Sequence, residues 1–295
     1  MANLKTATGN NAANSITKAI AEKWLKDEDT VDLSDFEQLD DLAAEVLAKY
    51  DGTIDLNGLT TLSEDAAKSL AQHHHGPLKL DGLTGISDEV ANALANHAGG
   101  LSLNGLATLS DEAAKAFAKH RNTLRLSGLA KLSNEVATAL AKHSCSLELN
   151  GLTTLTDDTA ETLATCEGQL ILDGLTTLSD RAAEAFGQHK DDLWLSGLSK
   201  LSDEVAKALA KHEGLLRLDC LQELSVEAAR ALAQHKGELY LDELPSLSDD
   251  AAKALANSVG FVSLLGLTEL SEEAEASLLA NDKIQIGDVE DEDDY

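Results

Sequence analysis

The sequence predicts an α/β fold in which a curved solenoid carries parallel strands on one side and short, Ala-rich helices on the other. Three observations predict it. A phrase of the form Leu-x-Leu-x-Gly-Leu returns every 23 residues. Its alternation of apolar and variable positions is typical of a strand with one buried face. A Ser or Thr, an acidic pair and an Ala-rich run then follow, which indicates a helix start. One such pair cannot bury its apolar face alone, but stacked copies form a continuous core.

The N-terminal segment, residues 1–30, is predicted to contain a helical cap. Residues 15–25 form an amphipathic pattern, in which Ile16, Ile20 and Trp24 share one helical face. This face is expected to cover the first repeat, and Trp24 is expected to lie in the core of the cap rather than in a ligand site.

Residues 31–286 are predicted to form eleven repeats and a terminal strand at residues 284–286. Degenerate copies begin at Val31 and Val262. The only insertion in the regular period falls in the turn at residues 73–77. The other nine repeats begin at Ile54, Leu78, Leu101, Leu124, Leu147, Leu170, Leu193, Leu216 and Leu239.

Each position within a repeat has an expected role, counted from the first Leu as position 1. Positions 1, 3, 6 and 9 are apolar and are expected to point into the core. The Gly at position 5 indicates a bend that needs either positive φ or close neighbours. The Ser or Thr at position 10 is expected to cap a helix, with carboxylates at positions 11 and 12 facing the positive end of its dipole. The helix is expected to end near position 20.

The chain is strongly acidic, with a net charge of −29. Helix starts supply 17 of the 52 acidic residues, and an acidic tail at residues 287–295, expected to be solubilising, supplies six more. This charge disfavours binding to nucleic acid or anionic lipid, and no apolar run approaches the ~20 residues that span a bilayer. Without a visible export segment, the expected location is the cytoplasm.

The repeat resembles leucine-rich repeat proteins, in a bacterial-type variant with a 23-residue period. The resemblance covers about 256 of the 295 residues. It departs from the usual LxxLxLxxNxL motif, because Leu106 and its equivalents stand where the family has Asn, and the next Leu comes one residue late. The resemblance implies non-catalytic protein or peptide recognition on the concave strand face.

The candidate binding residues come from position 2, the outward-facing position of each strand. Trp, Tyr and Arg are enriched at interface hot spots, and they fall in consecutive repeats here. The alternatives are a carbohydrate or small polar ligand stacked on Trp194, an acidic DNA mimic, and a purely structural repeat protein with cross-strand aromatic pairs. The predicted binding residues are Arg125, Glu148, Ile171, Trp194, Arg217 and Tyr240.

Two further columns are predicted to be structural. The Asn, Asp and Ser residues at position 4 are expected to cap the Gly turn through an Asx-type bond to the backbone rather than to bind calcium. Histidine occupies position 20 in seven repeats and is expected to cap helix carbonyls, with a raised pKa if capping favours the charged form. A metal or pH-sensing role is the alternative for the seven residues His73, His97, His120, His143, His189, His212 and His235.

No pattern in the sequence predicts an enzyme, a metal site or a cofactor. The chain has no P-loop, GxSxG, HExxH or dinucleotide-binding motif. Cys145, Cys166 and Cys220 are too few and too irregular for a disulfide framework. The cluster at His73, His74 and His75 predicts adventitious metal binding only.

Overall fold

The structure is a computed structural model that describes residues 14–287. These residues form two compact units, residues 14–128 and residues 129–287, which we call unit 1 and unit 2. The predicted acidic tail lies outside the described residues, apart from Gly287.

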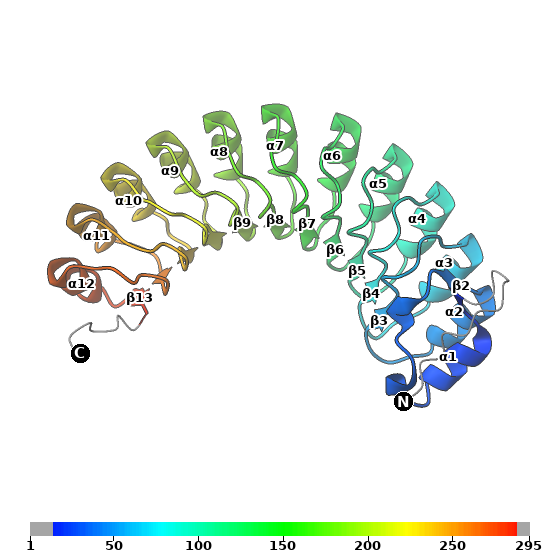
Figure 1. The fold of residues 1–295 in the computed structure, drawn as a ribbon. Helices are drawn as coiled ribbons and strands as arrows, with labels where there is room; N and C mark the ends of the chain where they lie inside the picture. Colours follow the sequence, from blue (N-terminus) through cyan, green and yellow to red (C-terminus); the bar gives the residue numbers. More distant parts are fainter. Residues whose placement is uncertain (1–13, 288–295) are drawn as a thin grey trace. The chain divides into compact units, whose positions relative to one another are not determined.

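In both units short parallel strands alternate with helices, as the sequence predicts (Figure 1). Unit 1 contains β1 (Ser15–Ile16), α1 (Lys18–Trp24), the 3₁₀ helices η2 (Glu28–Thr30) and η3 (Leu33–Asp35), β2 (Gln38–Leu39), α2 (Asp41–Leu47), β3 (Ile54–Asp55), α3 (Glu64–Leu70), β4 (Leu78–Lys79), α4 (Asp88–Leu94), β5 (Leu101–Ser102), α5 (Asp111–Phe117) and β6 (Leu124–Arg125).

Unit 2 repeats the same pattern and ends on the predicted terminal strand. It contains α6 (Asn134–Leu140), β7 (Leu147–Glu148), α7 (Asp157–Leu163), β8 (Leu170–Ile171), α8 (Asp180–Phe186), β9 (Leu193–Trp194), α9 (Asp203–Leu209), β10 (Leu216–Arg217), α10 (Val226–Leu232), β11 (Leu239–Tyr240), α11 (Asp249–Leu255), β12 (Val262–Leu264), α12 (Glu272–Leu279) and β13 (Ile284–Ile286).

The strands pair in a register equal to the sequence period. Leu216 lies opposite Leu193 on one side and Leu239 on the other, so equivalent positions form columns across the sheet. Within unit 2 the helices α7 to α12 fan out while their strands stay adjacent (Figure 1), so this stack bends with the strands on its inner side.

The core lies between the strands and the helices. The leucines at positions 1, 3, 6 and 9 divide into two groups. The first three are fully buried in most repeats, as at Leu101, Leu103 and Leu106, whereas position 9 is half-exposed, as at Leu109. From the helix side, positions 13, 14 and 17 close the core, with Ala113, Ala114 and Phe117 in one repeat. Small Ala side chains let the helices pack closely against the strands.

The predicted Ser caps also link neighbouring repeats. The Ser110 hydroxyl accepts a hydrogen bond from the Ala113 N–H at 3.0 Å and donates to Asp88 Oδ1 of the preceding helix at 2.5 Å. The helices are shorter than expected, because they end at position 17 and continue as a tighter turn. In this turn the N–H of His120 donates to the carbonyl of Phe117, three residues earlier.

The N-terminal cap differs from its prediction in where the helix begins. Trp24 is buried and contacts Tyr50 edge-on, with ring centroids 4.6 Å apart, which confirms its place in the core. However, α1 begins at Lys18, because Thr17 is its N-cap. Ile16 lies instead in β1, which pairs with β2 in parallel.

The strand expected at Val31 is also wrong. A 3₁₀ helix, η3, takes its place, because Asp32 Oδ1 accepts hydrogen bonds from both the backbone N–H and the hydroxyl of Ser34, at 2.9 and 2.7 Å. Such local side-chain bonds compete with strand formation.

Candidate functional site

The strand face rests on a ladder of side-chain hydrogen bonds from position 4. In unit 1, Asn57 Oδ1 accepts from the Asp81 N–H at 2.9 Å, and Asp81 Oδ1 accepts from the Asn104 N–H at 2.8 Å. In unit 2, Asn150 and Asp173 make the same bond to the following repeat, both at 2.9 Å. These side chains bond to the backbone as predicted, but the predicted local cap of the Gly turn is wrong, because the capped N–H belongs to the next repeat.

On this face of unit 2, Trp194, Arg217 and Tyr240 form a stack. They stand at position 2 of β9, β10 and β11, and the strand register places them side by side. The guanidinium carbon of Arg217 lies 4.7 Å from the centroid of the Trp194 ring and 5.0 Å from that of Tyr240. Both distances are within the range of cation–π contacts. We call these three residues the aromatic–arginine stack.

Polar neighbours fix the geometry of the stack. Arg217 Nε lies 2.9 Å from Asp219 Oδ2, and the two side chains are 31% and 17% exposed. Burial raises the pKa of Asp219, and the charges of Asp242 and Glu243 raise it further, while the hydrogen bond from the Asp242 N–H and the charge of Arg217 act against the rise. The Tyr240 hydroxyl donates to Glu238 Oε2 at 2.8 Å, and this bond raises the pKa of Tyr240.

The indole nitrogen of Trp194 is buried and has no hydrogen-bond partner among residues 14–287. Arg217 Nε also lacks a hydrogen bond of good geometry within these residues, although it is ion-paired with Asp219. The ring therefore acts as a packing surface here, held by Arg217 on one of its faces.

The structure brings most of the predicted binding residues onto the strands of unit 2. Ile171 lies beside Trp194 in the register but is only 8% exposed, so it offers little surface. Glu148 lies beside Ile171 and accepts a hydrogen bond from the Asn150 amide at 3.2 Å. Arg125 belongs to β6 of unit 1.

The carboxylates around the stack also contribute to this surface, which the sequence did not predict. Asp219 and Asp242 occupy the position-4 column, which was predicted only to cap backbone. Glu243 stands where most repeats have Gly, and this departure was the available signal. Glu238 occupies the variable position before its strand, so the repeat pattern gave no signal for it.

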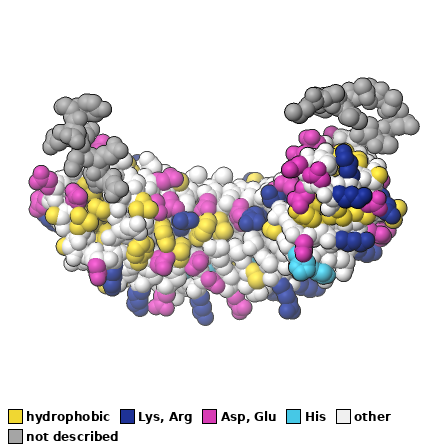
Figure 2. Space-filling view, turned by 90° about the horizontal axis from the view of Figure 1, so that it is seen from below, with side chains coloured by type: hydrophobic (Ala, Val, Ile, Leu, Met, Phe, Trp, Pro, Cys, Tyr) yellow, Lys and Arg dark blue, Asp and Glu magenta, His cyan; other side chains and the backbone are white. Residues whose placement is uncertain are grey.

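Hydrophobic side chains gather in a band over the strands of unit 2, in the left half of Figure 2, and acidic side chains lie on both sides of the band. Among the described residues, no group of three His, Cys, Asp or Glu side chains is placed to hold a metal ion.

The architecture has the features of the family that the sequence resembles. Each repeat has a short parallel strand, a leucine core and a ladder of side-chain amide or carboxylate oxygens bonded to the next strand. The fold is a leucine-rich-repeat solenoid.

Solved leucine-rich-repeat structures are similar to this chain at low identity. One is a leucine-rich-repeat protein of Leptospira interrogans, with 16% identity, coverage of 90% of this chain and 94% of that chain, and a TM-score of 0.41. An internalin of Listeria monocytogenes has 16% identity, coverage of 88% and 82%, and a TM-score of 0.49.

The Toll–Spätzle complex of Drosophila is similar at 13% identity, with a TM-score of 0.47. It covers 80% of this chain, which spans 39% of the matched one. No protein-family model and no curated protein matches the sequence. None of the helices within residues 14–287 has the length and apolar character that crossing a membrane requires.

The position-20 histidines form buried ladders in this leucine-rich-repeat fold. All seven are at most 2% exposed. In unit 1, the rings of His73 and His97 stack with centroids 5.4 Å apart. In unit 2, His189, His212 and His235 stack at 6.0 and 5.9 Å.

The predicted capping of carbonyl oxygens is seen at His97, His189 and His212, but these carbonyls belong to the preceding repeat, and the raised pKa expected for a charged cap is wrong. A ring nitrogen of His97 lies 3.2 Å from the carbonyl oxygen of Gly76, and one of His189 lies 3.3 Å from that of Ala164. His212 Nδ1 lies 2.9 Å from the carbonyl oxygen of His189, at the end of the preceding repeat. Burial lowers the pKa of these imidazoles because it disfavours the charged form. The pKa of His97 falls to about 4. Lowered values also hold for His73, His120, His189, His212 and His235.

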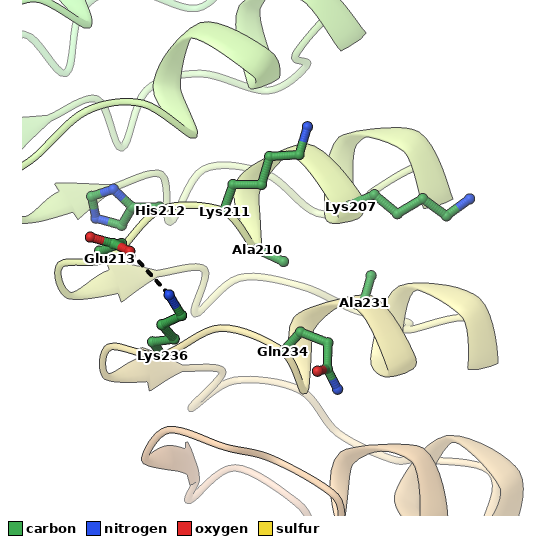
Figure 3. Close-up of a pocket in the computed structure, with 8 residues that line it drawn as sticks. All are labelled: Lys207, Ala210, Lys211, His212, Glu213, Ala231, Gln234 and Lys236. Carbon is green, nitrogen blue, oxygen red and sulfur yellow. Dashed lines mark hydrogen bonds and ion pairs between the residues drawn. The ribbon is translucent and has the colours of Figure 1, made fainter.

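Open grooves lie between the helix ends on the other side of the repeat. One, of about 450 Å³, lies between the C-terminal ends of α9 and α10 (Figure 3). Its Lys236 pairs with Glu213 at 3.2 Å, as the dashed line in the figure marks. A similar groove of about 600 Å³ includes Cys166 and Lys190 two repeats earlier. Because this feature recurs with the repeat, it follows from the packing of helix ends.

Proposed function

We propose that the protein is a non-catalytic binding module that recognises a protein or peptide through the strand face of unit 2. The observation that carries this proposal is the aromatic–arginine stack. Large, partly exposed aromatic side chains contribute most to binding when they are already ordered, because little rotamer entropy is lost on contact. Arg217, Asp219 and Glu238 supply that order.

The stack favours a polypeptide over the carbohydrate alternative. A sugar would stack on the face of Trp194, but Arg217 covers one face of this ring. An extended peptide needs only the outer edges of the rings and the ridge that they form across β9, β10 and β11. Carbohydrate binding is therefore kept as a competing outcome of the experiment described next.

A library of random linear peptides displayed on phage tests the proposal. Peptides selected by the full chain are labelled with a dye, and their binding is measured by fluorescence anisotropy against a Trp194→Ala, Tyr240→Ala variant. The expected result is a loss of affinity of about tenfold or more, as for hot-spot residues.

A matched control comes from the same position in unit 1. Asp55 and Lys79 form an ion pair at 3.2 Å, so an Asp55→Ala, Lys79→Ala variant removes two position-2 side chains without changing net charge. This control should bind normally. Enrichment of no peptide, or equal binding to both variants, would overturn the proposal. Glycan-array binding that is lost on Trp194→Ala would replace it with carbohydrate recognition.

A further inference from the structure

The stack is flanked by carboxylates on both sides of the strands. Before the strands stand Asp191, Asp192 and Glu238. After them stand Asp173, Asp219, Asp242 and Glu243. These seven carboxylates lie in the four repeats that begin at Leu170, Leu193, Leu216 and Leu239. In each repeat we consider the stretch from two residues before the strand to position 5, and the four stretches together contain a single basic residue, Arg217.

Arg217 is already engaged within the molecule. Its guanidinium group lies between two aromatic rings and against Asp219. A carboxylate from a partner would have to displace Asp219 and approach six further negative charges. Arg217 therefore does not offer a site for a carboxylate of a partner.

Three of these carboxylates lie near enough to Cys220 to raise the pKa of its thiol. Burial and the negative charges of Glu243, Asp219 and Asp173 raise the pKa of the Cys220 thiol to about 11. Cys220 lies beside Asp219, and its Sγ lies 3.3 Å from Glu243 Oε2. The region next to the stack thus has a negative potential, which favours a cationic group.

We propose, on the basis of the proposed function, that the partner of this surface is a basic, extended peptide segment. Its Arg or Lys side chains lie along the aromatic–arginine stack and pair with the flanking carboxylates. Arg217 itself illustrates the recognition, because a guanidinium group fits between Trp194 and Tyr240 at cation–π distance with a carboxylate at its edge. Neighbouring strands lie ~4.8 Å apart, so β8 to β11 span roughly 15 Å, the length of about five extended residues.

The test uses three dye-labelled peptides of equal length on a Gly-Ser background, carrying four arginines, four aspartates or no charge. A chain with net charge −29 attracts any cationic peptide, so the decisive comparison is between two variants with equal charge change. The first is Asp173→Asn, Asp242→Asn. Asn occupies position 4 naturally at Asn57, Asn104 and Asn150, and keeps the oxygen that the ladder needs.

The control variant is Asp180→Asn, Asp250→Asn, at exposed helix starts away from the strand face. We expect the arginine peptide to bind and the aspartate peptide not to bind. The strand-face variant should weaken binding of the arginine peptide about fivefold or more, and the control variant less than about twofold, at an ionic strength near 0.15 M, where the Debye length is ≈ 8 Å.

Equal weakening by both variants would overturn the inference, because it would trace the attraction to net charge alone. Stronger binding of the neutral or acidic peptide would overturn it as well. If that binding is lost on Trp194→Ala, Tyr240→Ala, the proposed function still stands. If the phage library also yields no peptide, the proposed function fails independently.

Discussion

Arg217 makes three separate interactions, and each has a modest energy. Cation–π contacts at partly exposed sites are worth roughly 0.5–1 kcal/mol each. The Arg217–Asp219 pair is partly buried, with 31% and 17% exposed side chains, so it is less screened than an ordinary surface pair. The planar guanidinium group is essential to this arrangement, because it can stack on two rings and present its edge to a carboxylate.

Replacement of Arg217 is expected to destabilise unit 2. We expect Arg217→Ala to lower the free energy of unfolding by about 1–3 kcal/mol, since it removes both ring contacts and leaves Asp219 without its cation. Arg217→Lys keeps the positive charge but lacks the planar guanidinium group, so it should retain only part of the stability that Arg217→Ala loses.

Urea denaturation followed by Trp fluorescence measures both Arg217 variants in a Trp24→Phe background, where Trp194 is the only reporter. Equal stability of the Lys variant and the parent chain would contradict a role for planar stacking.

The sequence predicts which residues share the stack but not how they interact. A 23-residue period places Trp194, Arg217 and Tyr240 in one column, because strand register follows the period. Whether Arg217 points to solvent or folds between the rings depends on side-chain rotamers and on Asp219, two residues away. Local sequence patterns do not encode that choice. The same limit explains why histidine capping was predicted and its charge was not, since burial decides the charge.

At the scale of the element, the position-5 glycines are required by close approach between repeats. None of the described glycines has a positive φ, so of the two reasons that the sequence allows, crowding is the correct one. A Cβ at Gly105 would meet the carbonyl oxygens of Asp81 at 2.0 Å and Leu83 at 2.7 Å. These atoms belong to the backbone of the preceding repeat and cannot move alone.

The variant Gly105→Ala is therefore expected to be strongly destabilising. Repeats would have to separate or shift to admit the methyl group, at a cost of about 2–4 kcal/mol. Gly85 is the natural control in unit 1, because a Cβ there meets nothing within 4 Å. Gly85→Ala should be neutral or slightly stabilising. Thermal unfolding by circular dichroism compares the two, and similar melting temperatures would contradict the crowding argument.

Helix length shows where the pattern of apolar residues misleads. Apolar residues continue to position 18, which suggests a helix to position 20. The backbone instead tightens after position 17, as at Phe117 and His120, and at some repeats the position-20 side chain then reaches a carbonyl oxygen of the preceding repeat, as His212 does. This is a contact between repeats, so it is invisible to a window of local sequence.

At the scale of the whole molecule, the histidine ladders link stability to pH. The free histidine pKa is about 6.5, and six described histidines have lower values in the fold. The unfolded chain thus binds more protons than the folded chain between these values and 6.5. Stability is fully present above about pH 6.5 and is lost as the pH falls below it, the opposite of the trend expected for a charged cap.

The expected pH dependence is steep because the histidines act together. Each one contributes up to about 1.4 kcal/mol per pH unit within its window. Urea midpoints measured from pH 8 to pH 5 should fall continuously below about pH 6.5. Constant midpoints, or midpoints that rise on acidification, would contradict the burial of neutral imidazoles.

A histidine substitution separates this effect from general acid sensitivity. Asn281 occupies position 20 of the last helical repeat, and its amide donates to the carbonyl of Ser258 at 3.0 Å. An Asn at this position can therefore bond to the carbonyl of the preceding repeat, as His212 does, without a group that titrates. His212→Asn is expected to reduce the slope of the free energy of unfolding against pH by the contribution of one titrating group, which is about one bound proton. The exposed His75 serves as the control, and His75→Asn should leave the slope unchanged.

The direction of the position-4 ladder has a consequence for the order in which the chain is made. Each ladder oxygen accepts an N–H from the repeat that follows it in sequence. A nascent chain therefore presents a side-chain acceptor that is already in place whenever the next 23 residues leave the ribosome. The strand N–H groups differ, because that of Leu78 donates to the carbonyl of Gly100, which is made later. The series stops at Leu265, where position 4 has no polar oxygen to offer. The position-4 ladder thus grows in the direction in which the chain is synthesised, and it ends at the last repeat.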